Sequence, residues 1–123
     1  MRILVFSKKW DKLNNEILFT TFRYPRRDKD WQIEEVVQVV YKSRSKGGGE
    51  RLGIAQIIGK ERRRTVCSIP IDIPMISESE AQTDGFEDYQ SMIDWLTKIY
   101  FHREPMRQVS PINKLTLRKV GDW

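Results

Sequence analysis

Apolar residues in short runs, or at every second position, predict several β-strands in this chain. Residues 36–41 form a run of β-branched and aromatic residues, and isoleucines alternate with other residues over 69–73. A strand is also predicted wherever a comparable run is bounded by glycine, proline or polar residues. The predicted strands span residues 2–6, 16–24, 36–41, 51–59, 64–71 and 113–120.

The second predicted strand, residues 16–24, has two different faces. Successive side chains of a strand point to opposite sides, and Pro25 ends the strand because proline has no N–H for the ladder. Thr21 and Arg23 are therefore expected beside each other on one face. The two faces carry Ile17, Phe19, Thr21 and Arg23 on one side, and Leu18, Thr20, Phe22 and Tyr24 on the other.

Two helices are predicted between residues 77 and 100, and one helical turn between residues 7 and 15. Ser77 and Glu80 form a capping box, and Gly85 ends the first helix because it adopts the left-handed conformation easily. Asp88 is the predicted N-cap of the second helix, whose apolar face carries Met92, Ile93, Leu96, Ile99 and Tyr100. Strands and helices together predict an α+β fold. We expect a small mixed β-barrel of about five or six strands with two or three flanking helices.

The length and composition suit one domain, residues 1–123, because 39% of 123 residues are hydrophobic. The single cysteine, Cys67, and the single histidine, His102, exclude a disulfide framework and a histidine-cluster metal site. We expect Cys67 to be buried and inert, His102 to lie at the surface, and no metal or cofactor to be bound. The apolar run Ile3–Phe6 is too short for a signal peptide or a membrane span. A soluble, cytoplasmic protein without a membrane partner is expected, in an oligomeric state that the sequence leaves open.

The net charge of +5 is distributed unevenly. Residues 71–97 carry seven acidic side chains and no lysine or arginine, so the rest of the chain carries a balance of +12. A positive face attracts polyanions such as RNA, although a small soluble protein can carry this charge without such a partner. The basic residues cluster as Arg23, Arg26, Arg27 and Lys29, as Lys42, Arg44 and Lys46, and as Lys60, Arg62, Arg63 and Arg64.

Trp31 follows the first basic cluster directly. An aromatic ring beside phosphate-binding arginines suits base stacking, and the alternative is that Trp31 closes the end of the barrel. The glycines at 47–49 lack the lysine and hydroxyl residue of a phosphate-binding loop, so they indicate a hairpin loop instead.

Two segments carry a resemblance to a known family. Thr20-Thr21-Phe22-Arg23 ends an early strand, and Ile76–Ala81 is followed by Asp84-Gly85-Phe86 and a helix that ends in Ile99-Tyr100. This arrangement, with Gly53–Ile57 on the strand between, resembles the ASCH domain. ASCH domains belong to the PUA-like superfamily of small β-barrels, and the resemblance covers roughly residues 16–120.

The resemblance implies binding of RNA or a nucleotide in a basic cleft between barrel and helices. In this family a strand end rich in lysine and arginine lines the cleft. Thr21 and Arg23 match the family's Thr-x-Arg pattern, and Asp84 falls where some relatives carry an acid in the cleft. Some small relatives are amidohydrolases that deacylate an acetylated cytidine with a lysine, a threonine and an acid. Leu18 stands where that lysine belongs, which removes the cation that activates a hydroxyl.

The leading hypothesis is therefore an RNA- or nucleotide-binding domain. The first alternative is an amidohydrolase on a modified cytidine nucleoside, with Thr21 and Asp84 as catalytic residues. The second is a protein-interaction module, favoured if the helix with Met92 and Tyr100 leaves an apolar stripe exposed. The predicted ligand-binding residues are Thr21, Arg23, Arg26, Arg27, Lys29, Trp31, Arg62, Arg63 and Arg64.

Overall fold

Five strands form one mixed sheet in the computed structural model, which describes residues 1–6, 12–15, 17–26, 28–42, 49–65, 72–121 and 123. Their order across the sheet is β1-β3-β4-β5-β2. The pair β1–β3 is parallel, and the other three pairs are antiparallel. The strands are β1 (Arg2–Phe6), β2 (Leu18–Arg23), β3 (Val36–Lys42), β4 (Gly49–Arg63) and β5 (Ile112–Val120).

Strand β4 is longer than the sequence predicts. It continues from Gly49 to Arg63, whereas the pattern predicts one strand over 51–59 and another over 64–71. A shift in register between Ile57 and Gly59 lets β4 bend and stay paired with β5. Most of the predicted strand over 64–71, including Cys67, lies outside the described residues, and Arg64 there forms only an isolated bridge with Met75.

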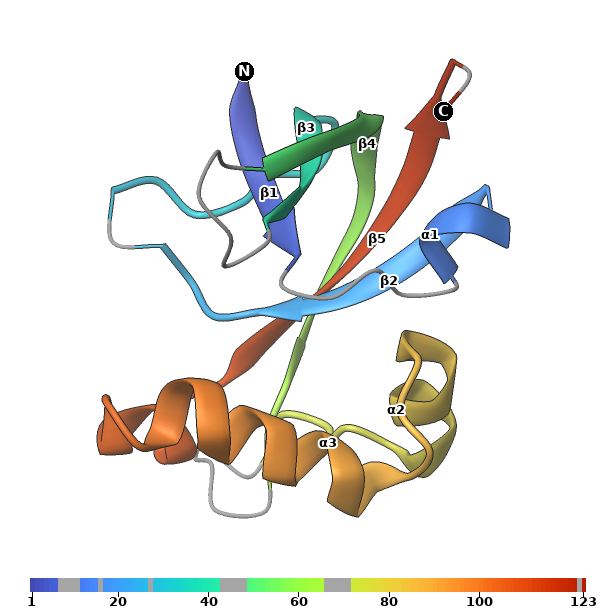
Figure 1. Cartoon of the computed structure of the whole chain (residues 1–123). Coiled ribbons are helices and arrows are strands. Elements are labelled where there is room, and N and C mark those ends of the chain that lie inside the picture. Colours follow the sequence, from blue (N-terminus) through green and yellow to red (C-terminus); the bar gives the residue numbers. More distant parts are fainter. Residues whose placement is uncertain (7–11, 16, 27, 43–48, 66–71, 122) are drawn as a thin grey trace.

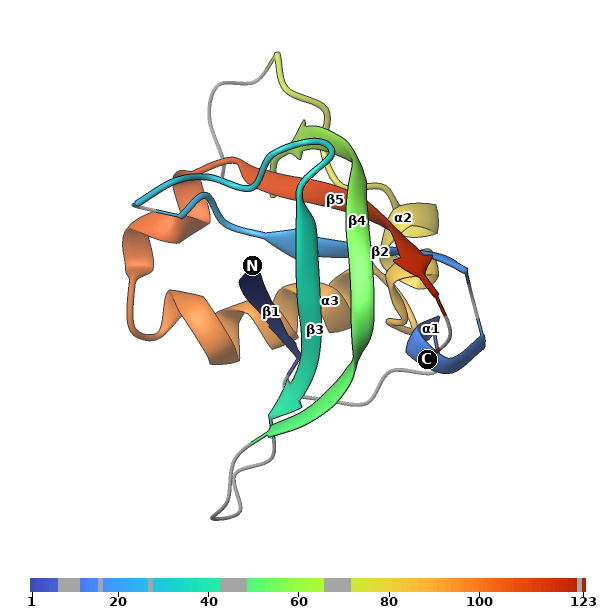
Figure 2. The same cartoon turned by 90° about the horizontal axis from the view of Figure 1, so that it is seen from above.

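The closed barrel is not observed, so this part of the prediction is not confirmed. The sheet is curved, and β1 and β2 are its two edges (Figure 2). These edges meet through side chains: the rings of Phe6 on β1 and Phe19 on β2 are 6.2 Å apart between centroids. The guanidinium of Arg23 on β2 lies 4.7 Å from the centre of the Phe6 ring. Bulky side chains thus occupy the space that a backbone ladder between the edges would need.

The main core lies inside the curve of this sheet. The core residues of β1, β3, β4 and β5 fall at every second position of their strands, as expected for a sheet with one buried face. Trp31, from the loop between β2 and β3, joins this core with only 5% of its surface exposed. The cluster consists of Leu4, Phe6, Leu13, Phe19, Trp31, Val37, Val39, Ala55, Ile57, Leu115 and Leu117.

The helices form a second layer below the sheet (Figure 1). They are α2 (Glu78–Asp84) and α3 (Tyr89–Leu96), and α3 continues through the π-helical turn η1 (Thr97–Phe101). The one-turn helix α1 (Lys12–Asn15) precedes β2, and the 3-10 helix η2 (Pro105–Val109) lies in a segment predicted as a loop. A second core of Phe22, Tyr24, Ile76, Ala81, Met92, Leu96, Phe101 and Ile112 joins the two layers.

The helix boundaries agree with the predicted caps. The Ser77–Glu80 capping box is present, and Gly85 ends α2 with φ 115°. The side chain of Asp88 accepts a hydrogen bond from the Ser91 backbone at the start of α3. None of the described helices is long and apolar enough to cross a membrane.

Candidate binding cleft

A cleft of about 190 Å³ lies between the edges of the sheet and the helix layer. Its walls come from four parts of the chain: the end of β1, α1, the second half of β2, and the α2–α3–η1 segment. The residues that line it are Val5, Phe6, Lys12, Thr21, Phe22, Arg23, Asp84, Phe86, Met92, Trp95, Leu96, Ile99 and Tyr100.

The cleft brings together Thr21, Arg23 and Asp84, three residues singled out in the sequence. Thr21 and Arg23 share one face of β2, and Arg23 Nε donates a hydrogen bond of 3.1 Å to the Thr21 hydroxyl oxygen. Asp84 arrives from the other layer as the last residue of α2, where Gly85 turns the chain away. The alternation of side chains along β2 and the C-terminal cap of α2 therefore bring Thr21, Arg23 and Asp84 into one site.

Lys12, which no sequence pattern singles out, is the partner of Asp84. Its Nζ lies 2.8 Å from Asp84 Oδ1 and donates to the backbone oxygens of Asp84 and Thr20, each at 2.7 Å. Only 7% of either side chain is exposed. Burial lowers the pKa of Lys12 and raises that of Asp84, whereas the attraction between them opposes both shifts. The hydrogen bonds from Lys12 to Asp84 and to two backbone oxygens compensate part of the cost of burying this ion pair.

Arg23 carries a positive charge that no acidic side chain of the described residues neutralises by direct contact. Among the described residues, its one hydrogen bond goes to Thr21, and no carboxylate oxygen lies within 4.0 Å of its guanidinium. Burial lowers its pKa, and the nearby Tyr100 and Asp84 oppose that shift. Since Lys12 and Asp84 cancel, the lining of the cleft carries one net positive charge. An anion that entered the cleft would supply the missing contact.

The remaining wall of the cleft is apolar and aromatic. Phe86 is half-buried and packs against Trp95, with ring centroids 6.2 Å apart. Ile99 and Tyr100 reach the cleft from the π-helical turn η1, in which the N–H of His102 bonds to the oxygen of Thr97. Such turns change the direction of side chains along a helix and are common at functional sites. The cleft can therefore hold a flat apolar group beside an anionic one.

A second depression, here called the side groove, continues from the cleft. Arg23, Val5 and Tyr100 line both. The side groove measures about 510 Å³ and also contains Arg26 and Trp31. The Trp31 ring is buried, and the guanidinium groups of Arg2 and Arg26 lie 4.6 and 5.3 Å from its centre. Trp31 thus supports these arginines and is itself mostly covered.

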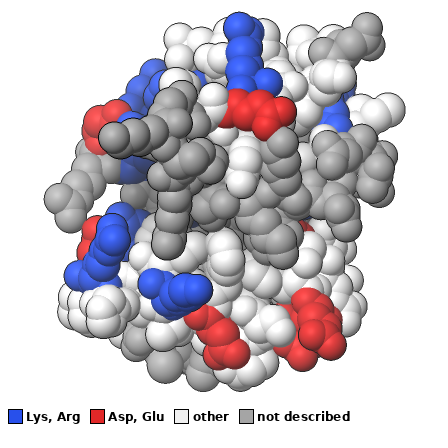
Figure 3. Space-filling view, in the orientation of Figure 1, with Lys and Arg blue, Asp and Glu red and all other residues white. Residues whose placement is uncertain are grey.

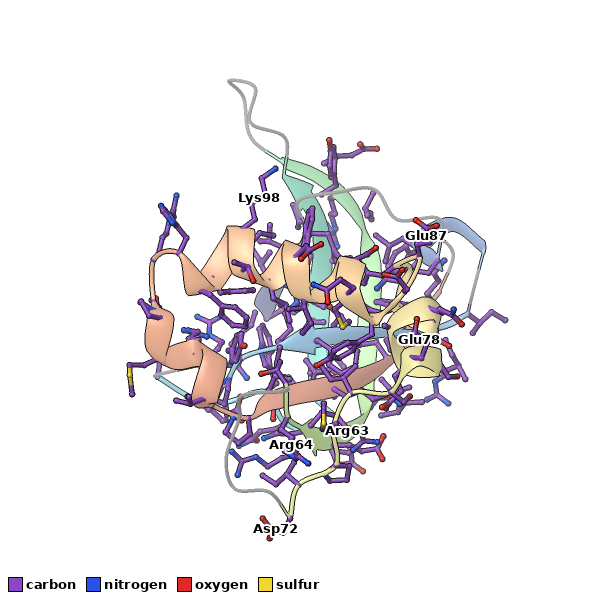
Figure 4. The ribbon with its side chains drawn as sticks, turned by 90° about the horizontal axis from the view of Figure 1, so that it is seen from below. Arg63, Arg64, Asp72, Glu78, Glu87 and Lys98 are labelled. Carbon is purple, nitrogen blue, oxygen red and sulfur yellow. The ribbon has the colours of Figure 1, made fainter. Side chains whose placement is uncertain are left out.

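Several predicted binding residues do not line the cleft. Arg63 binds Glu80 and Glu61, and Arg64 Nε donates to the backbone oxygen of Ile73 at 2.7 Å. In the view of Figure 4, Arg63 and Arg64 lie on one side of the strands, at the bottom of the picture, and Lys98 lies on the other side, beside α3. Arg62 is exposed near the same end of β4, Lys29 lines a separate depression near the N-terminus, and Arg27 lies outside the described residues.

The acidic segment that the sequence shows at 71–97 forms part of the helix layer. Figure 3 shows two groups of acidic side chains on the lower part of the molecule, where α2 and α3 lie. The apolar stripe of α3 faces inward, with Met92 and Leu96 buried in the second core. The exposed stripe that would favour a protein-interaction module is thus not found on α3.

Two residues of these sites, Lys12 and Arg107, are not among the binding residues predicted from the sequence. Arg107 lies in η2 and lines the side groove, within residues 101–111, for which the sequence predicts a loop with two prolines. One signal pointed to a cation near Asp84: an aspartate at the C-terminal end of a helix is unfavourable next to the negative end of the helix dipole. Asp84 therefore required a cation, but nothing in the sequence identified which one.

No family model, curated protein or solved structure matches this chain. Among the described residues, no three histidine, cysteine, aspartate or glutamate side chains group as metal ligands do.

Proposed function

We propose that this protein binds RNA or a nucleotide in the cleft between the sheet and the helices. The observation that carries the proposal is Arg23, whose guanidinium lines the cleft without an acidic partner among the described residues. An arginine fork fits the oxygens of a phosphate or the edge of a base. Phe86 and Trp95 supply an apolar wall for the base. The proposed site has the basic cleft and the Thr-x-Arg strand end that the resemblance to ASCH domains implies.

The decisive test replaces Arg23 by methionine, which keeps the apolar contact with Phe6 and removes the charge. We expect Arg23→Met to weaken binding of nucleoside monophosphates by about 1–3 kcal/mol, the range for a good bidentate arginine contact. Isothermal titration of each of the four ribonucleotides measures this. Arg62→Met is the matched control, because Arg62 is exposed and lines neither the cleft nor the side groove. Equal affinities of the two variants, both folded, would contradict the proposal.

One observation favours a second candidate function, deacylation of an acetylated cytidine. Lys12 lies in the cleft with Thr21 and Asp84, and so supplies the cation that Leu18 does not. However, the hydrogen bonds of Lys12 go to Asp84 and to the backbone of Thr20, while the Thr21 hydroxyl contacts Arg23. Thr21 then has no base in hydrogen-bond contact among the described residues, and a threonine hydroxyl stays protonated at neutral pH without one.

We therefore expect binding of the nucleoside without turnover. Incubation of the purified protein with acetylated cytidine, followed by chromatography of the products, measures the release of acetate. Release well above the uncatalysed rate that disappears in both Thr21→Ala and Lys12→Met would establish the hydrolase instead.

A further inference from the structure

The side groove combines positive charge with aromatic rings. The guanidinium of Arg107 lies 4.8 Å from the ring centre of Tyr24 and 5.6 Å from that of Tyr100. The two tyrosine rings meet edge to face at 5.2 Å. Arg26 lies over Trp31 in the same way. Arginines on aromatic rings are held in place while their polar edges stay available to a ligand.

Two arginines of the groove, Arg26 and Arg107, pair with exposed carboxylates. Arg26 contacts Asp28, whose side chain is 63% exposed, and Arg107 contacts Glu104, whose side chain is 46% exposed. Exposed ion pairs contribute little, so a phosphate can replace either carboxylate at small cost. Arg23, Arg26 and Arg107 supply three positive charges to the lining, against one negative charge from Asp28.

The floor of the groove is apolar and open. Ile3 and Val5 project from the edge strand β1 and are 49% and 37% exposed. Exposed apolar side chains beside arginines match the two parts of a single-stranded nucleic acid, whose bases are flat and apolar on their faces and whose backbone is anionic.

The volumes of the cleft and of the side groove indicate which part of a ligand each site can hold. The cleft, at about 190 Å³, is smaller than the roughly 300–1,000 Å³ of sites that enclose a drug-sized molecule. The side groove, at about 510 Å³, falls within that range. A nucleotide whose base enters the cleft must leave its neighbours outside, and Arg23 at the junction connects the two sites.

We infer that the ligand is a single strand of nucleic acid that runs out of the cleft along the side groove, with Arg107 and Arg26 holding its backbone. This inference rests on the proposed function and deepens it, since it selects an oligonucleotide over a free nucleotide. The nucleic-acid strand fits better than an acidic peptide because the exposed apolar side chains Ile3 and Val5 lie beside the cations of the groove.

The experiment compares ligands and variants by fluorescence anisotropy. A labelled mixed-sequence RNA hexanucleotide, its DNA counterpart and a hexaglutamate peptide are titrated against the wild type, with nucleoside monophosphates as unlabelled competitors. The variants are Arg107→Met, Arg26→Met and the control Arg103→Met, since Arg103 is exposed and lies outside the groove. Thermal unfolding of each variant shows that it is folded.

We expect the hexanucleotide to bind at least tenfold more tightly than any monophosphate. Arg107→Met should weaken the hexanucleotide about tenfold, a loss typical of one charge-assisted hydrogen bond to a phosphate, and leave the monophosphates unchanged. Equal binding of the DNA hexanucleotide supports the inference and means that the groove does not contact the 2′-hydroxyl.

Two results would overturn the inference while the proposed function stands: a hexanucleotide no tighter than Arg23-dependent monophosphates, or equal binding by the Arg107 and Arg103 variants. Hexaglutamate binding as tight as RNA would make an acidic peptide the occupant and also overturn it. If neither monophosphates nor hexanucleotides bind, the proposed function fails, and the inference fails with it.

Discussion

At the scale of single residues, the cleft depends on the buried pair of Lys12 and Asp84. Each charge pairs with the other although both side chains are mostly buried, and Lys12 also caps the end of α2 by donating to the backbone oxygen of Asp84. Removing one partner of such a pair leaves the other charged and buried, which costs more than the pair itself contributes. The pair therefore holds α1 against α2 and shapes the site around Thr21 and Arg23.

The single variant Lys12→Met should lower the free energy of unfolding by about 3 kcal/mol or more, because Asp84 loses its counter-charge. The double variant Lys12→Met with Asp84→Leu should recover most of that loss, since both charges are gone. Chemical denaturation of the wild type and the three variants, including Asp84→Leu alone, measures the coupling. Additive losses in the double variant would show that the two residues act independently.

At the scale of elements, Glu80 joins α2 to the sheet. Its carboxylate contacts Arg63 of β4 at 3.0 Å and Lys114 of β5 at 2.7 Å, and it accepts from the Ser77 backbone in the capping box. Burial opposes ionisation, but the hydrogen bonds from Lys114 and Ser77 and the charge of Arg63 prevail and lower the pKa of Glu80 to about 2. One residue thus fixes both the start of α2 and its place under β4 and β5.

This pKa makes stability depend on pH in acid. Because the pKa of Glu80 in the folded protein lies below its ordinary value of 4.5, its contribution is complete above about pH 4.5 and is lost as the pH falls towards 2. Glu80→Gln should therefore destabilise the protein by about 1–2 kcal/mol at neutral pH, after allowance for water around the network. Urea denaturation of the wild type and of Glu80→Gln, at neutral pH and near pH 2, measures the difference in their free energies of unfolding. If this difference stays constant down to pH 2, the lowered pKa of Glu80 is contradicted.

At the scale of the whole molecule, features that depend on neighbouring residues were predicted correctly more often than features that depend on contacts between distant segments. The alternation of β2 placed Thr21 and Arg23 on one face, and the Ser77–Glu80 box with Gly85 set the bounds of α2, because these depend on neighbouring residues only. Barrel closure depends on whether β1 and β2, far apart in sequence, pair at their edges, and side chains such as Phe6 fill that space instead.

The distribution of charged residues along the chain likewise does not predict which of them meet in the fold. Arg63 belongs to a basic run, yet its charge is taken up by Glu80, an acid of a different segment that only the fold brings near. Arg107, isolated in the sequence, lies over the Tyr24 ring beside the cleft. The order of basic residues along the chain therefore does not show which arginines the fold pairs with a mostly buried acid, as it does Arg63, and which remain available to a ligand.

The salt dependence of RNA binding tests the central claim most directly. If Arg23, Arg26 and Arg107 contact three phosphates, the logarithm of the association constant should fall with the logarithm of salt concentration with a slope of about −2, at about 0.7 per phosphate of a single strand. Arg23→Met should reduce that slope by about 0.7 and Arg62→Met should leave it unchanged. Anisotropy titrations of a labelled RNA hexanucleotide at several salt concentrations provide the slopes. Absence of binding at low salt, or a slope that is flat or unaffected by Arg23→Met, would contradict the assignment of this cleft as an RNA-binding site.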